Sequence, residues 1–297
     1  MTLPAASSTI TQAEFEELIQ EIRPDLHRYV ARMIGSAVDA EDVVQEALVK
    51  ANDSLALLTA RSNVRGWLFR IAHNKAIDQL RRDHDRPAEL LDEYPMTVEP
   101  DQPLEEKELA ALALSVFLKL APRQRSCVIL KDVLGYSLAE ISELLDATVP
   151  EIKAALHRGR TRLRELAPSD EVSAPILDAR QQELLARYVD RFNARDFDAV
   201  RAMLADEVRL DLVGRAKVVG AAAVNNKYFY NYSLVHDWRL ALGRVEGRLA
   251  ILVYDPAEAS ARPAYCALIT WDGDQVSRIR DYRYARYIMP DAEVSAL

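Results

Sequence analysis

The chain has 297 residues, 49% of them hydrophobic, and a formal net charge of −8. This length suits two or three small hydrophobic cores, and no apolar run approaches the ~20 residues of a membrane-spanning helix. The first residues lack the basic and apolar segments of a secretory signal, so we expect a cytoplasmic protein without membrane contact. Cys127 and Cys266 stand far apart in apolar stretches, which predicts two buried free thiols.

The charge is distributed unevenly along the chain. Residues 61–82 hold six basic side chains and one acidic side chain, and residues 83–108 hold two basic and ten acidic ones. Residues 153–164 hold five basic side chains and no acidic one. The negative total therefore hides two basic patches and does not exclude nucleic-acid binding.

Helices are predicted over residues 11–82, where apolar side chains recur at helical spacing. Asp39 is the expected N-cap of the second helix, because an acidic first turn follows it. Residues 52–64 are predicted to be mostly loop. A third helix is predicted over residues 65–82, and its buried stripe is expected to contain Trp67, Leu68, Ile71, Ala72, Ile77 and Leu80.

Residues 83–104 are predicted to be a linker, because they contain four prolines, many acids and little periodicity. Residues 105–166 are predicted to be helical again. Ser137 and Thr148 each begin a capping box with a glutamate three residues later, and a tight turn separates the two helices. Two capped helices joined by a short turn, the second rich in arginine, are typical of a helix-turn-helix.

The composition changes after a second linker around residues 167–175, and nine of the twelve tyrosines follow it. Two helices are predicted near residues 178–194 and 197–205. Strand-like alternation comes next, with hairpin-turn signals at residues 245–248 and 271–275. Helices followed by an antiparallel meander predict an α+β domain with a curved sheet.

Three blocks carry a family resemblance: DAEDVVQEALVKA, GWLFRIAHNKAIDQLRR and LKLAPRQRSCVILKDVLGYSLAEISELLDATVPEIKAALHRGRTRLRE. In this order and spacing they resemble the extracytoplasmic-function (ECF) sigma factors of the sigma-70 family. The resemblance implies an all-α region 2 domain at residues 11–82, an acidic linker at 83–104, and an all-α region 4 helix-turn-helix domain at 105–167. Residues 178–297 resemble an appended SnoaL-like (NTF2-like) cone, on phrases such as FNARDFDAVRAMLADEVRL.

Such a sigma factor would bind core RNA polymerase and direct promoter-specific transcription initiation. The implied polymerase-binding residues are Asp39, Glu41, Asp42, Gln45 and Glu46. Their acidic helix face suits a basic partner, and an ordinary solvated face is the alternative. By the same resemblance, the acidic linker would run through the active-site cleft and RNA exit channel of the polymerase; a plain solvated tether is an equal alternative.

Two further sets of residues are implied to contact promoter DNA. Those for the minus-10 element are Arg61, Asn63, Arg65, Arg70, Asn74, Lys75, Arg81 and Arg82. They offer charge and polar edges to single-stranded DNA, whereas the loop 56–64 contains no aromatic residue. His73 stands where the family commonly has arginine, and Trp67 is expected to be core.

The helix over residues 150–164 would enter the major groove at the minus-35 element. Its base-reading candidates are Glu151, Lys153, Ala154, His157 and Arg158. Arg160 and Arg162 are expected to grip phosphates. The expected core residues of this helix are Ile152, Ala155, Leu156 and Leu163.

The C-terminal domain is expected to regulate the first two domains by intramolecular contact, with a small apolar ligand as a further partner. The residues expected in its pocket or interface are Tyr228, Tyr232, Trp238, Tyr265, Tyr282, Tyr284 and Tyr287. A DNA-targeted enzyme of the isomerase or cyclase kind is the alternative, with polar candidates Asp211, His236, Asp237 and Asp281. No motif pairs an acid with a base, so we expect no catalysis, cofactor or metal. The final tail could also merely close the sheet.

Overall fold

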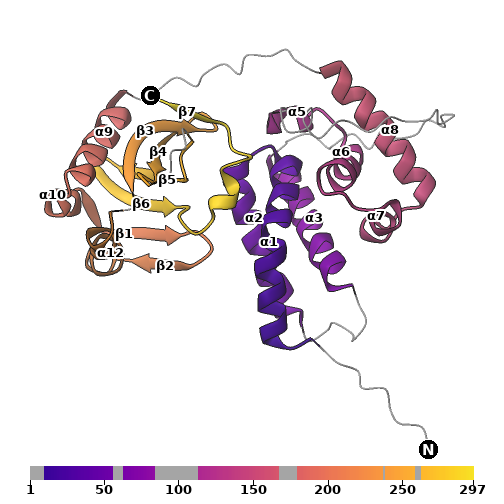
Figure 1. The fold of residues 1–297 in the computed structure, drawn as a ribbon, viewed down its shortest axis with the longest axis horizontal. Coiled ribbons are helices and arrows are strands. Elements are labelled where there is room, and N and C mark those ends of the chain that lie inside the picture. Colours follow the sequence, from indigo (N-terminus) through magenta and orange to yellow (C-terminus); the bar gives the residue numbers. More distant parts are fainter. Residues whose placement is uncertain (1–9, 56–62, 84–112, 167–178, 237, 258–261) are drawn as a thin grey trace, which may run out of the picture. The chain divides into compact units, whose positions relative to one another are not determined.

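The computed structural model describes residues 10–55, 63–83, 113–166, 179–236, 238–257 and 262–297. The chain forms two compact units, Met1–Asp170 and Glu171–Leu297, and Figure 1 shows that the first is helical and the second contains the sheet. Among the described residues, no helix has both the length and the hydropathy of a membrane span. Asp83, the first residue of the expected linker at 83–104, ends the third helix, and the rest of that linker lies outside the described residues. The predicted contact Arg61 and most of the loop 52–64 also lie outside them.

Three long helices form the first part of the helical unit: α1 (Gln12–Ile34), α2 (Ala37–Asp53) and α3 (Val64–Asp83). They bury a shared core that includes Phe15, Leu26, Val44 and Phe69. Phe69 was missing from the predicted stripe of the third helix, although it is fully buried. Trp67 is half-buried and lies against Phe15, with ring centroids 6.4 Å apart, as expected of a residue at the core.

The predicted N-cap of the second helix was wrong by three residues. Ser36 has extended backbone angles, and its hydroxyl accepts a hydrogen bond from the backbone N–H of Asp39 at 3.0 Å. A hydroxyl in this position satisfies an N–H group that the helix itself leaves unpaired. Asp39 therefore lies within the first turn of α2.

The helix-turn-helix is confirmed in the second part of this unit. The elements are α5 (Leu114–Phe117), α6 (Pro122–Val128), the π-helix η2 (Ile129–Val133), α7 (Leu138–Leu145) and α8 (Val149–Leu166). Both capping boxes form, because the backbone N–H groups of Ser137 and Thr148 donate to the glutamates three residues later at 2.8 and 2.7 Å. A Cβ at Gly159 would lie 2.7 Å from Val128, so α8 packs closely on α6.

The C-terminal unit begins with helices α9 (Ala179–Asn193) and α10 (Phe197–Arg201). The strands β1 (Leu204–Leu212) and β2 (Ala216–Val219) precede a helical stretch of α11 (Ala221–Val224), the π-helix η3 (Asn225–Phe229) and α12 (Tyr230–Leu234). The strands β3 (Arg239–Val245), β4 (Arg248–Tyr254), β5 (Tyr265–Asp272) and β6 (Gln275–Asp281) follow. A short 3₁₀ turn, η4 (Arg286–Ile288), and the strand β7 (Val294–Ala296) end the unit.

The sheet has the strand order β2-β1-β6-β5-β4-β3-β7. The antiparallel meander of β3 to β6 and the α+β class are confirmed, but β1 pairs with β6 in parallel, which a simple meander does not include. The first hairpin turns through Glu246 and Gly247, both with positive φ, as its sequence predicts. Cys127 in the helical unit and Cys266 in β5 are both buried and free, as predicted.

Candidate functional site

The outer face of α2 is polar, with one apolar residue in it. Its exposed side chains are Asp42, Gln45, Glu46, Val49 and Lys50. Val49 is 52% exposed and was missed by the sequence analysis, although it lies four residues after Gln45 and thus on the same helix face. An exposed aliphatic side chain among acidic groups suits a protein partner that has both basic and apolar surface.

Two of the predicted polymerase-binding residues do not lie on this face. Glu41 is 1% exposed, and its carboxylate forms an ion pair with Arg23 of α1. Because Arg23 draws this carboxylate between the helices, the prediction of Glu41 as a contact residue was wrong. Arg23 also donates to Gln45 at 2.8 Å and so fixes one residue of the outer face. Asp39 is half-buried in the first turn.

The predicted minus-10 residues on α3 fall into two groups. Asn74, Arg81 and Arg82 are exposed. Lys75 is half-buried and donates to Glu46 of α2 at 3.1 Å. Arg81 and Arg82 lie in the last turn of α3, where they also suit the helix dipole.

The second group is Arg65 and Arg70, which contact other parts of the unit. Arg65 donates to Asp25 of α1 at 3.0 Å, and Arg70 donates to the backbone carbonyl of Glu143 in α7 at 2.5 Å. Asn63 is exposed just before α3, and its side chain accepts the backbone N–H of Gly66 at 2.9 Å. Asn63 therefore starts the helix, a role that its position before the predicted helix could have indicated.

His73 faces inward from α3. One ring nitrogen lies 2.7 Å from the hydroxyl of Tyr29, and burial lowers the pKa of His73 to about 4. The imidazole is therefore neutral at physiological pH and adds no charge to α3.

The recognition helix α8 displays most of the residues expected to read DNA. Glu151, Lys153 and Arg162 are exposed, and Ala154, His157 and Arg158 are half-buried. Glu151 closes the capping box with Thr148, and its carboxylate lies 3.3 Å from the guanidinium of Arg123. The carboxylate therefore already has two partners within the protein. The predicted core residues Ile152, Ala155, Leu156 and Leu163 are all buried.

Arg160 was wrongly expected to grip phosphate. Its guanidinium is buried and donates to both carboxylate oxygens of Asp132 in η2, at 2.9 and 2.6 Å. Arg160 lies four residues after Leu156, on the buried stripe of α8, so the helical spacing could have revealed its position. A bidentate ion pair in this place fastens α8 to the preceding helices.

A basic cleft of about 350 Å³ lies beside the second half of α8. It is lined by Lys119, Gln124, His157, Arg158, Thr161, Arg162 and Glu165. Arg162 donates to Glu165 at 3.0 Å, and the remaining cations outnumber this one acid. The cleft can accept a phosphate group, which needs positive charge and several hydrogen-bond donors.

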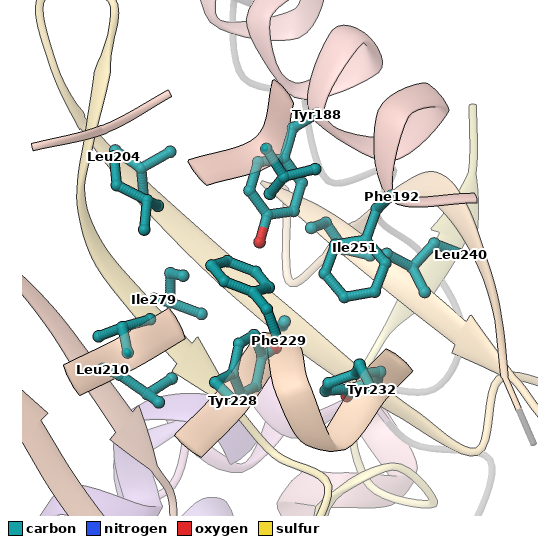
Figure 2. Packing of buried hydrophobic residues seen from close by; sticks show 14 of the residues in the cluster. Tyr188, Phe192, Leu204, Leu210, Tyr228, Phe229, Tyr232, Leu240, Ile251 and Ile279 are labelled. Carbon is teal, nitrogen blue, oxygen red and sulfur yellow. The ribbon is translucent and has the colours of Figure 1, made fainter. Parts of the chain in front are cut away.

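The aromatic residues expected to line a pocket in the C-terminal unit fill its core instead. Tyr228, Tyr232, Trp238 and Tyr265 are each 1–7% exposed. Phe192 of α9 contacts the rings of Tyr232 and Trp238 edge-on, with centroids 5.2 and 5.1 Å apart. Figure 2 shows the ring of Phe192 from α9 and those of Tyr228 and Tyr232 from the helical stretch packed over the sheet.

A buried carboxylate lies within this core. Asp281, fully buried at the end of β6, accepts hydrogen bonds from the hydroxyls of Tyr228 at 2.6 Å and Tyr232 at 2.9 Å. Tyr265 contacts the hydroxyl of Tyr232 at 2.9 Å and accepts from Arg283 at 3.0 Å. Burial raises the pKa of Asp281, whereas its hydrogen bonds lower it.

The polar residues considered for catalysis are not brought together. Asp211 of β1 pairs with Arg278 at 3.4 Å, and in the sheet register it faces opposite to Asp281. His236 is exposed, and Asp237 lies outside the described residues. Among the described residues, the side chains that donate to the Asp281 carboxylate are those of Tyr228 and Tyr232.

The final segment divides between core and surface. Tyr282, the residue after β6, is fully buried, and its place in a pocket or interface stays a prediction. Tyr284 is 48% exposed, with Arg215 over its ring, and Tyr287 is half-buried. The strand β7 adds to the sheet beside β3, as the alternative for the tail anticipated.

Comparison with known proteins matches residues 18–86 to Sigma-70 region 2 and residues 111–163 to Sigma-70 region 4. The ECF RNA polymerase sigma factor SigG of Mycobacterium tuberculosis is 31% identical over 66% of this chain, which spans 60% of the length of that relative. The ECF sigma factor SigW of Bacillus subtilis is 31% identical over 52% of this chain and 89% of its own length.

The crystal structure of the ECF sigma factor SigJ of M. tuberculosis matches 90% of this chain and 95% of its own, at 19% identity and a TM-score of 0.35. An NTF2-like protein of unknown function from Cytophaga hutchinsonii is similar to 33% of this chain, over 95% of its own, at 22% identity and a TM-score of 0.25. The two region matches lie on the three helices of region 2 and on the helix-turn-helix of region 4. The chain therefore belongs to the extracytoplasmic-function sigma factors of the sigma-70 family.

Proposed function

We propose that the chain binds core RNA polymerase and directs promoter-specific transcription initiation in the cytoplasm. The observation that carries this proposal is the combination of one acidic helix face, on α2, with two basic helices, α3 and α8, in a single helical unit. The face around Glu46 and Val49 would dock on the polymerase. Asn74, Arg81 and Arg82 would hold the minus-10 strand.

At the minus-35 element, Lys153 and Arg158 would contact bases near the start of α8, while Arg162 and the basic cleft would hold phosphate. This division follows from exposure: Lys153 and Arg162 are exposed and Arg158 is half-buried, whereas Arg160 is buried and paired with Asp132. The proposed domains are the region 2 domain at residues 11–82, the linker at 83–104, the region 4 domain at 105–167 and the regulatory domain at 178–297.

Purified chain, added to core polymerase and genomic promoter fragments, should give transcripts with defined starts. If it neither comigrates with the core nor yields specific transcripts, the proposal fails.

The C-terminal unit would regulate the helical unit in cis rather than act as an enzyme. The full burial of Asp281 supports this part, because a catalytic carboxylate must reach its substrate. A small apolar ligand would need to displace packed aromatic rings, so protein contact through exposed Tyr284 is the favoured mode.

A chain ending after residue 168 and the full chain carrying Tyr284→Ser should both change promoter affinity and transcription. Tyr254→Ser, at a half-buried tyrosine elsewhere in the unit, is the matched control. Unchanged activity in both altered proteins, with both folded, would remove the regulatory role and favour the isomerase or cyclase alternative.

A further inference from the structure

One face of the sheet in the C-terminal unit is rich in cations. Its residues alternate along β1 and β6 with Leu210 and Ile279, which point into the aromatic core on the other face (Figure 2). Strand pairing arranges this outer face in two adjacent rows across β2, β1, β6 and β5. The rows are Lys217, Asp211, Arg280 and Leu268, and then Val219, Arg209, Arg278 and Thr270. We call the four cations of these two rows the basic sheet face.

The charge of the two rows is unbalanced. Arg209, Lys217 and Arg278 are exposed, and Arg280 is half-buried. Asp211 is the one acid in the two rows. Arg209 lies directly beside Arg278 in the strand register, and like charges on neighbouring strands destabilise a sheet. The stability of the unit therefore does not account for this pair, whereas an anionic partner would offset its repulsion.

Two of the cations are held in place by their neighbours. Asp211 is 9% exposed, and its carboxylate lies 3.4 Å from the guanidinium of Arg278 and 3.7 Å from that of Arg280. Arg280 also lies over the ring of the buried Tyr282, 5.4 Å from its centroid. Arg278 keeps 45% of its side chain exposed despite the ion pair. These guanidinium groups are oriented before a partner arrives, which lowers the entropic cost of binding it.

The chemistry of the face suits the phosphates of duplex DNA. Arginine presents a planar set of donors that binds phosphate oxygens in pairs. Residues two apart on a strand, such as Arg278 and Arg280, lie ~6.8 Å apart, and each DNA strand carries a charge every ~3.4 Å along the axis. The two rows contain no aromatic ring on which an unpaired base could stack, which favours duplex over single-stranded DNA.

The place of the unit in the chain also favours DNA. Residues 167–178 join the end of α8, at Leu166, to the start of α9, at Ala179. These twelve residues reach at most ~43 Å when extended. When α8 lies in the major groove, the tether therefore keeps the C-terminal unit close to the neighbouring DNA, at a high effective concentration.

We propose that the basic sheet face binds the phosphate backbone of duplex DNA next to the minus-35 element, without reading its sequence. The proposal rests on the proposed function, because it takes α8 as the helix that reads this element. A second DNA contact on the same chain would lengthen the time that the chain stays on a promoter. Residues 83–108, with ten acidic and two basic side chains, are the other anionic occupant that charge allows.

The first test is the affinity of the full chain for a random-sequence duplex of about 40 base pairs, ~136 Å long, at several salt concentrations. The variant that combines Arg209→Gln with Lys217→Gln removes two exposed cations of the face. The matched control combines Arg187→Gln with Lys227→Gln, at exposed positions of α9 and η3. In the first variant, the slope of log affinity against log salt should fall by about 0.9 for each cation, or about 1.8, and it should stay unchanged in the control.

The second test is photo-cross-linking, which identifies the occupant of the face. Val219→Cys carries the cross-linker within the second row, and Tyr230→Cys carries it on α12. The two native side chains are similarly exposed, at 57% and 59%. The native thiols of Cys127 and Cys266 are buried and do not compete for the reagent. We expect several-fold more cross-linking to the duplex from position 219 than from position 230.

Equal salt slopes in the two double variants, or equal cross-linking from the two positions, would overturn the proposal. Cross-links from position 219 into residues 83–108, with none into DNA, would overturn it in favour of a protein occupant. If the variant of Arg209 and Lys217 loses amide-exchange protection in β1, the cross-linking result decides. Absence of transcripts, with a salt slope that still depends on Arg209 and Lys217, would count against the proposed function and not against this face.

Discussion

The two units of this chain place their polar residues differently. In the helical unit, most residues expected to bind a partner lie at the surface, as Glu46, Lys153 and Arg162 do. In the C-terminal unit, most residues expected to bind a ligand lie in the core, as Tyr232 and Asp281 do. A motif-bearing helix buries one face and displays the other, whereas aromatic residues on strands and short helices pack together unless a ligand holds them apart.

The same contrast appears inside α8, between two arginines two residues apart. Arg160 is buried on Asp132, and Arg162 is exposed. Charge alone therefore does not identify a DNA contact; the helix face decides it.

The largest loss of stability is expected from substitution of Arg160. Arg160→Ala leaves Asp132 buried without its cation, which costs about 3–5 kcal/mol of stability in the helical unit. Arg162→Ala, the matched control, should stay within about 0.5 kcal/mol. Amide hydrogen exchange resolved over α8 measures the stability change in each variant, because it reports on each unit of the chain separately. Equal protection in the two variants would mean that the buried pair contributes nothing.

The next largest loss of stability is expected from substitution of Asp281, the buried carboxylate of the C-terminal unit. Asp281→Ala leaves the hydroxyls of Tyr228 and Tyr232 without their acceptor and should cost about 3 kcal/mol. Asp281→Asn keeps one acceptor oxygen and should cost less. Exchange in β6 and α12 measures the loss; protection that survives Asp281→Ala would show that the tyrosines find other partners.

The same residue predicts a pH dependence. Burial raises the pKa of Asp281 in the folded unit above its ordinary value of 3.8, so folding favours the protonated form. Its contribution to stability is therefore greatest at low pH and is lost as the pH rises through the folded-state pKa. The unfolding free energy of the unaltered unit, minus that of Asp281→Asn, should fall as the pH rises above 3.8. A rise over this range would mean that hydrogen bonding outweighs burial.

A third comparison separates base contacts from phosphate contacts on α8. Lys153→Ala should change the preference among minus-35 sequences by about 1–3 kcal/mol. Arg162→Ala should weaken all sequences alike and reduce the slope of log affinity against log salt by about 0.9. Binding titrations on specific and random duplexes at several salt concentrations distinguish the two. Equal losses on both duplexes for both variants would refute the division of roles.

The smallest expected effect concerns the outer face of α2. Glu46→Lys should weaken binding to core polymerase about tenfold, or about 1.4 kcal/mol, by reversing the charge opposite a basic partner. Glu17→Lys makes the same change at an exposed position of α1 and serves as the control. Equal affinities of the two variants in a competition assay would place the docking face elsewhere.

Local signals were predictable from the sequence, and long-range pairings were not. The capping boxes at Ser137 and Thr148 depend on residues three apart, and both were predicted. The parallel pairing of β1 with β6 joins segments that are distant in the sequence, and no local sequence pattern predicts it. Glu41 was misplaced because its partner Arg23 lies on another helix. Asp281 could have been placed in the core, since strand alternation puts it on the same face as buried Ile279.

We propose that the helical unit directs polymerase to promoters. The most direct measurement is transcription by purified core polymerase on a library of genomic promoter fragments, with the unaltered chain and with Arg162→Ala and Glu46→Lys. We expect transcripts with defined starts that depend on the chain and weaken with both Arg162→Ala and Glu46→Lys. An absence of transcripts would contradict the proposal. Transcription that both variants support as well as the unaltered chain does would also contradict it.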